Sequence, residues 1–399
     1  MSTIKVETGP VRDRAGSENG HRLVAEAGKV KGSTDQLDGL LRCCVKLGAS
    51  DMHLSSGKPI SYRVNGKLRS FGETIYSTEA VTTMCHSLMT EHQRAEFAKH
   101  WTADLGHSAS GGERFRINCY MEMGKPAMAV RHLDQNILGL EELGLPTRLR
   151  ELAYLKSGLV LVTGSTGSGK SSTLAVLLDE INRNRECHIL TVEDPVEFVH
   201  TSQKSLVHHR EVHRDVPSYA EAVRAAMRED PDVIMVGEMR DLETMQASII
   251  AAETGHLVFS TLHTGEAIGA IERFIGYFSG DEQGVARHRI SMVLKAVIAQ
   301  RLVIAADGTG RVPAVELLMV TTAAANLIQN SKTRQLYSMM ESGAKDGMWT
   351  LDQELARLVK NGKITKELAQ DLCNDKEGFK KHLSVAGGER CVWQSPRRL

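Results

Sequence analysis

The pattern of apolar residues divides the chain into two regions that differ in their predicted secondary structure. Within residues 35–132, apolar side chains at helical spacing over residues 37–47 predict an amphipathic helix, and a second helix is predicted from residue 77 to about residue 100. Short runs around Met52 and Tyr62 alternate between apolar and polar residues, which is typical of half-buried strands. The first region is therefore predicted to be a compact α+β domain.

The clearest strand of this region covers residues 113–120. Apolar and polar residues alternate strictly there, so one set is predicted to face the core and the other to face away from it. The first set is Phe115, Ile117 and Cys119, and the second is Arg114, Arg116 and Asn118. The strand thus places two arginines on the polar face of the predicted domain.

From residue 147 onward, wholly apolar strands alternate with helical segments. Strands are predicted at residues 158–163, 188–193, 233–236 and 256–261. Continuous apolar strands separated by helices indicate a parallel sheet that is covered on both faces. The chain is therefore predicted to be an α/β protein whose second region has a nucleotide-binding layout.

Three segments lie outside these two domains. Residues 1–34 are rich in small and charged residues without periodicity, which predicts a solvated, mobile tail. Residues 133–146 end in a turn-like Gly-Leu-Pro and are predicted to link the two domains. Residues 376–399 carry an excess of lysine and arginine and are predicted to form a basic tail, so the second domain is expected to cover residues 147–375.

Composition excludes several classes of protein. The chain has 49 Lys plus Arg and 49 Asp plus Glu, so it lacks the basic field that nucleic-acid binding requires. Its seven cysteines are odd in number and form no C-x-x-C pair, which argues against structural zinc and a disulfide framework. No apolar run approaches the roughly 20 residues that cross a bilayer, and the N-terminus has no apolar signal core, so a cytosolic location is expected.

A glycine-rich motif carries the predicted chemistry. It fits G-x-x-x-x-G-K-[ST] and consists of Gly164, Ser165, Thr166, Gly167, Ser168, Gly169, Lys170 and Ser171. It follows a predicted strand and precedes a helix with an apolar face over residues 174–181, so backbone N–H groups and the helix dipole are expected to cradle phosphate. Lys170 is expected to reach the β- and γ-phosphates, and Ser171 to bind Mg²⁺.

Acidic residues follow two of the predicted strands. Glu193, Asp194 and Glu197 follow the strand at 188–193, and Glu238 follows the strand at 233–236. In an open α/β sheet the carboxyl ends of strands form the ligand crevice, so these acids are expected to converge on the phosphate loop. They are candidates for the carboxylates that hydrolysis requires near the metal and the attacking water.

Histidines flank the strand at 256–261. His256 begins the strand and His263 follows it, and the pattern leaves open whether they are structural or sense the nucleotide. A further histidine-rich stretch at residues 208–214 has no supporting ligand cluster, so it is interpreted as an exposed polar loop rather than a metal site.

Several motifs together resemble one known family. They are GSTGSGKS, TVEDPVEFVH, REVHRD, REDPDVIMVGEMRDLET and AAETGHLVFSTLHT, preceded by ASDMHLS and RFRIN. In this order, over about residues 35–373, the chain resembles the PilT family of type IV pilus retraction ATPases within the secretion ATPase superfamily. The resemblance implies a PAS-like N-terminal domain followed by a RecA-like P-loop ATPase domain.

The resemblance also implies a function and a setting. ATP, with Mg²⁺, would bind between the domains of a homohexameric ring, and its hydrolysis would drive pilus retraction and twitching motility. The ring would act at the cytoplasmic face of the inner membrane through a platform protein, without nucleic acid, and a paralogous motor ATPase is a further expected partner. The expected alternatives are an accessory pilus motor and a type II or type IV secretion ATPase.

Site roles are carried over by matching motifs. The phosphate loop with Ser172 is the Walker A motif, and Glu193, Asp194 and Glu197 form the acidic box, with Glu197 as the general base. Glu238 is the Walker B acid near Mg²⁺, and His256 and His263 form the histidine box. Arginines of the N-terminal domain are expected to approach the phosphates, and the pattern does not separate Arg114, Arg116 and Arg131.

Two segments depart from the family pattern. Gly124-Lys125 stands where many relatives carry an arginine. Residues 324–329 read AANLIQ where relatives read A-I-R-x-L-I-R, so both arginines are missing. Because that segment is tied to retraction in the family, the departure bears on retraction and not on ATP hydrolysis.

Overall fold

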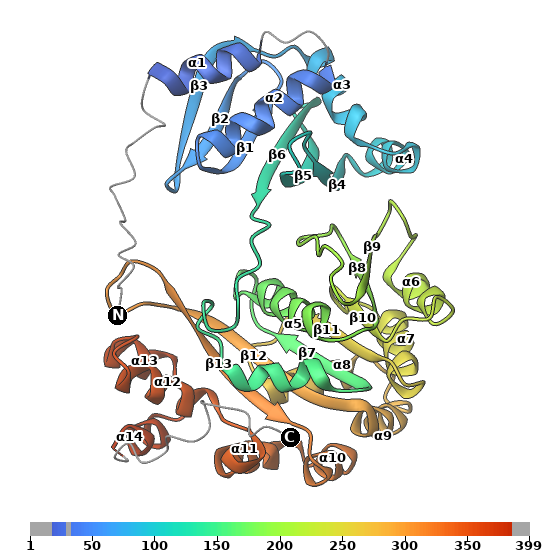
Figure 1. Ribbon diagram of the computed structural model, residues 1–399, viewed down its shortest axis with the longest axis vertical. Coiled ribbons are helices and arrows are strands. Elements are labelled where there is room, and N and C mark those ends of the chain that lie inside the picture. The colour runs from blue at the N-terminus through green and yellow to red at the C-terminus, as the bar shows by residue number, and fades with distance from the viewer. Residues whose placement is uncertain (1–17, 29–32, 385–399) are drawn as a thin grey trace. The chain divides into compact units, whose positions relative to one another are not determined.

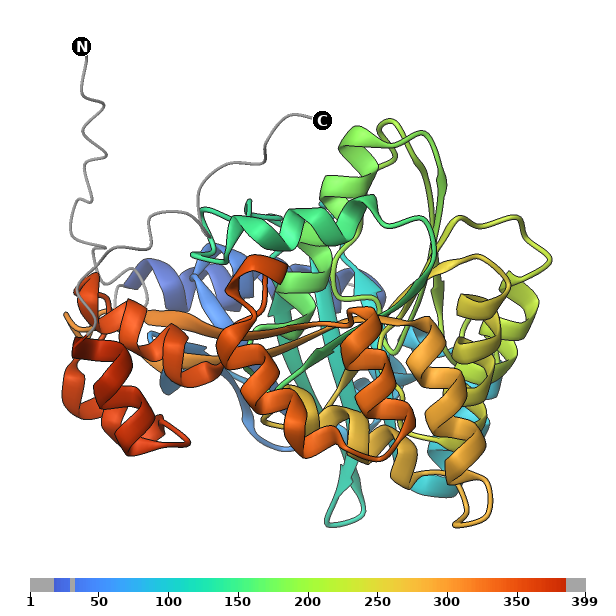
Figure 2. The same ribbon diagram turned by 90° about the horizontal axis from the view of Figure 1, so that it is seen from below.

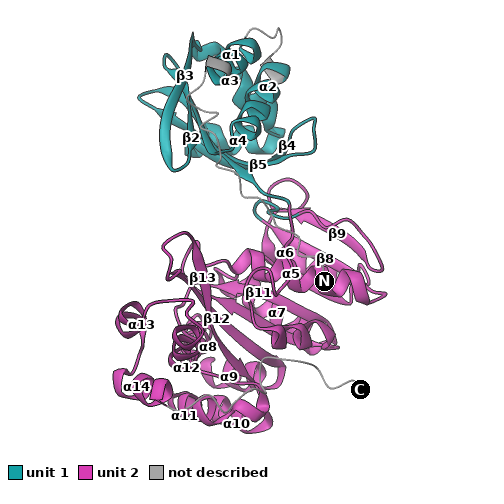
Figure 3. Cartoon of the chain, turned by 60° about the vertical axis from the view of Figure 1, so that its left-hand side comes forward, with its two compact units in different colours: residues 1–135, 194–198 teal, residues 136–193, 199–399 magenta. Residues whose placement is uncertain are grey.

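The structure of the chain is a computed structural model that describes residues 18–28 and 33–384 (Figure 1). It contains two compact units, shown in teal and magenta in Figure 3. Unit 1 consists of Met1–Gln135 together with Asp194–Phe198, and unit 2 consists of Asn136–Glu193 with Val199–Leu399. The predicted linear order of domains therefore needs one correction, because a segment of the predicted acidic box belongs by its contacts to unit 1.

Unit 1 is built on a six-stranded antiparallel sheet with the order β3-β2-β1-β6-β5-β4. Its strands are β1 (Ala49–Ser55), β2 (Pro59–Val64), β3 (Lys67–Ile75), β4 (Thr102–Ser108), β5 (Arg114–Glu122) and β6 (Lys125–Leu133). Its helices are α1 (Glu18–Ala27), α2 (Ser33–Lys46), α3 (Thr78–Leu88) and α4 (Glu91–His100). The predicted α+β domain is thus confirmed, and on β5 Phe115, Ile117 and Cys119 are fully buried. The alternation fails at Arg114, which was predicted to face away from the core and is buried.

Two predictions in unit 1 are wrong. The single helix expected over residues 77–100 is two helices, because Thr90 begins α4 with a reciprocal capping box to Gln93. The predicted N-terminal tail contains α1, whose Val24 and Ala27 are buried in the core of the unit. Residues 1–17 of that tail lie outside the described residues.

Unit 2 is built on a seven-stranded sheet with the order β13-β12-β7-β11-β10-β8-β9, drawn in green to orange in Figures 1 and 2. The strands are β7 (Gly158–Thr163), β8 (His188–Glu193), β9 (Leu206–Glu211), β10 (Val233–Val236), β11 (Leu257–Leu262), β12 (Leu294–Ile304) and β13 (Arg311–Met319). All neighbours are parallel except β12 and β13, which form an antiparallel pair at one edge. The predicted parallel sheet is confirmed, and β9, β12 and β13 join its four predicted strands.

Helices cover both faces of this sheet. They are η1 (Thr147–Tyr154), α5 (Lys170–Asn184), α6 (Tyr219–Ala226), α7 (Leu242–Glu253), α8 (Ala267–Gly276), α9 (Gln283–Val293), α10 (Thr322–Gln329), α11 (Leu336–Ser342), α12 (Leu351–Lys360), α13 (Lys366–Leu372) and α14 (Lys376–Ser384). On β7, Val160 and Val162 pack into one core with η1 and α5, while Leu159 and Leu161 pack into a second core with α6–α10. This alternation explains why the strand is wholly apolar.

The histidine-rich stretch and the basic C-terminal segment also differ from expectation. Residues 206–211 form edge strand β9 and not a loop, because His209 and Glu211 turn inward beside β8. Residues 376–384 form α14, whose Phe379 is fully buried against α12. The rest of the predicted basic tail, residues 385–399, lies outside the described residues. Across residues 18–28 and 33–384, no helix combines the length and apolar character that a membrane span requires.

A buried carboxylate links two helices of unit 2. Glu316 on β13 accepts hydrogen bonds from the backbone N–H of Ala267, at 2.7 Å, and of Leu351, at 3.3 Å. These are the first residues of α8 and α12, whose N–H groups lack partners within their own helices. Although burial raises the pKa of Glu316, the two N–H groups oppose that shift. Glu316 therefore ties the start of α8 to the C-terminal helices.

We expect Glu316→Leu to lower the free energy of unfolding of unit 2 by about 3 kcal/mol, since two buried donors lose their acceptor. Glu316→Gln keeps one carbonyl oxygen and should cost less. Denaturant unfolding followed by circular dichroism measures both. The control is Glu367→Leu, at an exposed position in the first turn of α13. An equal loss of unfolding free energy in Glu367→Leu would contradict the role of Glu316 as the acceptor for the first N–H groups of α8 and α12.

Candidate functional site

The glycine-rich motif forms a tight loop between β7 and α5. Gly164 and Gly169 adopt positive φ angles of 151° and 91°. A Cβ atom at Gly164 would collide with the backbone oxygen of Gln300, and one at Gly169 would lie 2.7 Å from the Gln300 side-chain nitrogen. Only glycine therefore allows the loop to fold this close to β12, which leaves its backbone free to approach phosphate.

The loop has the features of a phosphate cradle. Lys170 is buried, and its Nζ donates to the backbone oxygens of Gly164 at 2.9 Å and Ser165 at 3.0 Å. The hydroxyl of Ser168 is buried and has no hydrogen-bond partner among the residues that the structure describes. Ser171 and Ser172 follow in the first turn of α5 and are partly exposed. A lysine folded onto the loop and an unsatisfied hydroxyl fit the binding of an anion.

A polar pair behind the loop was missed by sequence reasoning. Gln300 on β12 is buried, and its Oε1 accepts a hydrogen bond from the hydroxyl of Thr173 on α5 at 2.6 Å. The pair connects the strand below the loop to the helix that follows it. The one signal in the sequence is a glutamine that directly follows the apolar run of residues 296–299, and its partner lies 127 positions away.

A second cluster lies at the carboxyl ends of β10 and β11. Glu238 lies 3.3 Å from Nε2 of His263 and 2.7 Å from Nε of Arg240. Next to His263, the backbone N–H of Thr264 donates a hydrogen bond of 2.9 Å to the side-chain hydroxyl of Thr163, the last residue before the phosphate loop. The structure thus connects the Glu238–His263 pair to the phosphate loop through neighbouring strands.

The two histidines expected to act together lie at opposite ends of β11. His256 precedes the strand, and its Nδ1 lies 2.8 Å from the backbone oxygen of Ala251 at the end of α7. His263 follows the strand on the side of the phosphate loop. At about 3.3 Å per residue, the strand separates them by roughly 20 Å. Within unit 2, His263 therefore lies at the end of β11 next to the glycine-rich loop, and His256 lies at the opposite end.

The predicted acidic box is divided between the units. Glu193 ends β8 in unit 2, where it is buried and lies 3.8 Å from His209. Asp194 and Glu197 belong to the short segment that packs with unit 1. Only Glu193 of the three is therefore placed by the fold of unit 2 itself.

The three candidate arginines have different surroundings. Arg114 is 7% exposed and donates to the backbone oxygen of Val196 at 3.0 Å and to the hydroxyl of Ser108 at 3.1 Å. The side chain of Arg116 is 41% exposed and lies 3.7 Å from Asp104. The side chain of Arg131 is 70% exposed and donates to Asp51 at 3.1 Å. Although burial alone would raise the pKa of Asp51, hydrogen bonds from Ser50 and Arg131 hold it below its usual value.

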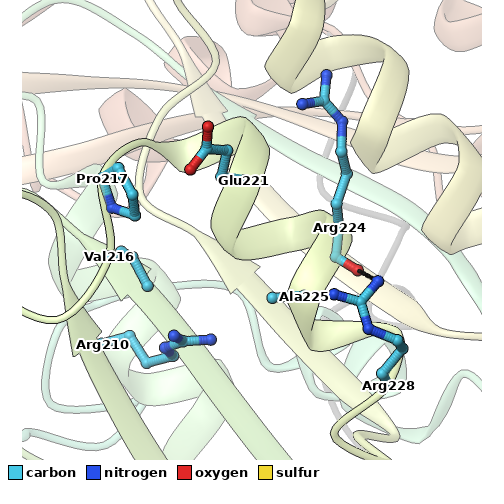
Figure 4. Close-up of a pocket in the computed structure, with 7 residues that line it drawn as sticks. All are labelled: Arg210, Val216, Pro217, Glu221, Arg224, Ala225 and Arg228. Carbon is cyan, nitrogen blue, oxygen red and sulfur yellow. Dashed lines mark hydrogen bonds between the residues drawn. The ribbon is translucent and has the colours of Figure 1, made fainter.

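A separate cavity of about 390 Å³ lies between β9 and α6 (Figure 4). It is lined by Arg210, Val216, Pro217, Glu221, Arg224, Ala225 and Arg228. Arg210 and Arg224 pair with Glu229 and Glu243 at 2.6 and 3.1 Å. These carboxylates offset the charge of two of the three arginines that line the cavity.

Comparison with known proteins decides the family. The model of the type II/IV secretion system protein family matches residues 33–382. The chain belongs to this family. It is 44% identical to the type IV pilus retraction ATPase PilT of Pseudomonas aeruginosa over 340 residues, which is 85% of this chain and 98% of that protein. It is also 39% identical to the type IV pilus ATPase PilU of the same organism, over 85% of this chain and 90% of that protein.

Solved structures agree with this assignment to the type II/IV secretion family. The structure described as the pilus retraction motor PilT with bound ADP superposes with a TM-score of 0.79 at 41% identity, covering 86% of this chain and 99% of that chain. The ATPase DotB of Legionella pneumophila superposes with a TM-score of 0.76 at 27% identity, covering 84% of this chain and 94% of that one. The resemblance inferred from the motifs and the predicted fold class are confirmed.

His200 follows the segment Asp194–Phe198 by two residues in the sequence, and its side chain is buried. Burial, together with the neighbouring His209, lowers the pKa of His200 to about 4. Its backbone N–H donates to Nε2 of His209 at 3.0 Å, and its Nδ1 has no hydrogen-bond partner among the described residues. The folded state therefore holds His200 in its neutral form.

The neutral form stabilises the fold fully above the ordinary histidine pKa of about 6.5, and this stability is lost as the pH falls toward 4. Between pH 7 and pH 5, we expect the free energy of unfolding to fall by about 2 kcal/mol more in the wild type than in His200→Gln. Urea unfolding at the two pH values measures the difference. Equal pH slopes in the two proteins would show that His200 titrates normally in the folded state.

Proposed function

We propose that this chain is an ATP-hydrolysing motor of the PilT type that drives type IV pilus retraction and twitching motility. The observation that carries the proposal is the glycine cradle with buried Lys170, followed by α5, in a chain that is 44% identical to the PilT of Pseudomonas aeruginosa. The solved PilT structure is described as containing bound ADP, which supports nucleotide binding by this chain. ATP is therefore the proposed substrate.

The residues present fit both the nucleotide and Mg²⁺. The backbone from Gly164 to Gly169 would hold the phosphates, with Lys170 exchanging its loop carbonyls for the β- and γ-phosphate oxygens. The hydroxyl of Ser171 and the carboxylate of Glu238 would hold Mg²⁺, which supplies charge neutralisation on the phosphates. Within residues 18–28 and 33–384, no three His, Cys, Asp or Glu side chains gather as a metal site, so the phosphates themselves would complete the coordination.

Glu197 is the proposed general base for the attacking water. Glu193 and Asp194 complete the acidic box, and His263 and Arg240 hold the carboxylate of Glu238 in place. Arginines of unit 1, namely Arg116 and Arg131, are the exposed candidates for a contact with phosphate charge, while His256 stays a prediction from the family motif. Such contacts would stabilise the transition state of phosphoryl transfer.

The assembly proposed for this activity is a homohexamer at the cytoplasmic face of the inner membrane. Its partners would be the pilus platform protein and a paralogous motor ATPase. In this proposal, unit 1 would supply the general base and unit 2 would hold the phosphates.

A second candidate is the role of an accessory pilus ATPase. The chain is nearly as similar to PilU, at 39% identity, as it is to PilT. Residues 324–329 form part of α10 and contain no arginine, and Gln329 at its end is exposed. This helix is the part of the chain that most favours the second role.

We expect Lys170→Ala to reduce ATP hydrolysis by at least about 100-fold, because the γ-phosphate loses its cation. In a deletion strain, wild-type protein should restore twitching, whereas Lys170→Ala should leave excess pili and no motility. Pilus counts by electron microscopy and a surface-motility assay measure the two. Loss of pili on deletion would indicate assembly instead, and unchanged pili and motility would favour the accessory role.

Glu197→Gln should behave differently from Lys170→Ala. The amide cannot accept the proton of water, so turnover is expected to fall about 10²–10⁴-fold while ATP affinity stays within twofold. Steady-state hydrolysis and a fluorescent-nucleotide titration separate the two effects. Undiminished turnover with tight binding would remove Glu197 from the role of general base.

A further inference from the structure

The acidic segment, Asp194–Phe198, belongs to a different unit from the residues on either side of it. It leaves unit 2 after Glu193, the last residue of β8, and re-enters unit 2 at Val199. Between these points, Asp194–Phe198 packs as part of unit 1. The proposed base Glu197 is therefore held by unit 1, although both neighbouring stretches of chain belong to unit 2.

Two side chains of unit 1 hold the backbone of this segment. Nη2 of Arg114 donates to the carbonyl oxygen of Val196 at 3.0 Å, and Nε2 of Gln135 donates to that of Glu197 at 2.8 Å. Val196 itself is 5% exposed. Two successive carbonyl groups are thus fixed, one in each of the peptide groups that flank the Cα atom of Glu197.

The burial of Arg114 indicates that its contact with Val196 is a fixed part of the fold of unit 1. Burying a guanidinium is costly unless its donors find acceptors, and two donors of Arg114, Nη1 and Nη2, donate to the Ser108 hydroxyl and the Val196 carbonyl. Arg116 and Arg131, in contrast, are exposed and lie against carboxylates. Arg114 thus has surroundings that suit a fixed structural contact.

We propose that Arg114 is a positioning residue, which sets the backbone of the acidic segment and so aims the carboxylate of Glu197. Gln135 is the second anchor of the same segment. The inference rests on the proposed role of Glu197 as general base. It departs from the expectation for this arginine, which was a direct contact with nucleotide phosphate.

The test compares Arg114→Met with Arg94→Met. Arg94 also donates to a backbone carbonyl in unit 1, that of His86 at 3.1 Å, but it is exposed and remote in sequence from the acidic segment. We expect Arg114→Met to lower kcat about 100-fold, since a displacement of about 1 Å at a reacting group has that effect. KM for ATP and the affinity for ADP should stay within twofold, and Arg94→Met should match the wild type.

A double-mutant cycle shows whether Arg114 acts through Glu197. In the Glu197→Gln background, Arg114→Met should cause no further loss of the residual single-turnover rate. A further loss of about 100-fold there, or a tenfold weaker affinity for ADP in Arg114→Met, would overturn the proposal and indicate a direct phosphate contact. If Glu197→Gln alone leaves turnover intact, the base assignment fails, which is a separate result.

Gln135→Met keeps the test available if Arg114→Met does not fold. It removes the second anchor without exposing a buried charge, and it should lower kcat about tenfold with unchanged KM. Arg114→Lys retains one donor and should recover part of the rate that Arg114→Met loses. Normal kcat in Gln135→Met together with normal kcat in Arg114→Lys would contradict a positioning role for these side chains.

Discussion

The close approach between the phosphate loop and β12 is the constraint on which the arrangement of unit 2 depends. Glycine at 164 and 169 brings the loop against the backbone and side chain of Gln300, and Thr173 returns a hydrogen bond from α5. The start of α5 is thereby fixed against the sheet, and β7 occupies the place between β12 and β11. The apolar cores on both faces then follow, since each strand must bury both of its sides.

The functional groups depend on that frame to different degrees. Glu238 and His263 follow adjacent parallel strands, so pairing between β10 and β11 brings them together without special local sequence. The hydrogen bond from Thr264 to Thr163 extends the same frame to the loop. Glu197 is positioned in a different way, because the side chains of Arg114 and Gln135 in unit 1 hold the backbone of its segment. The proposed phosphate cradle and the proposed general base thus belong to different units.

Sequence alone predicted the features that depend on local pattern. The glycine motif, the apolar strands and the face of α5 were predicted because spacing determines them directly. The break at Thr90, helix α1 and edge strand β9 were missed, because capping and packing against distant residues decide them. The pairing of Gln300 with Thr173 and the two-part composition of unit 1 could not be predicted for the same reason, because the residues in contact lie far apart along the chain. Roles such as that of Glu197 came from family resemblance and not from spacing.

The interrupted course of unit 1 has a consequence for how the protein is made. A ribosome that has released residues 1–135 has produced all the strands of the first sheet, but not the five residues that Arg114 and Gln135 hold. Those residues emerge only after β7, α5 and β8 of the second sheet. During synthesis from the N-terminus, Arg114 therefore gains its contact with Val196 late, and unit 1 is completed only after the first two strands of the second sheet have been made.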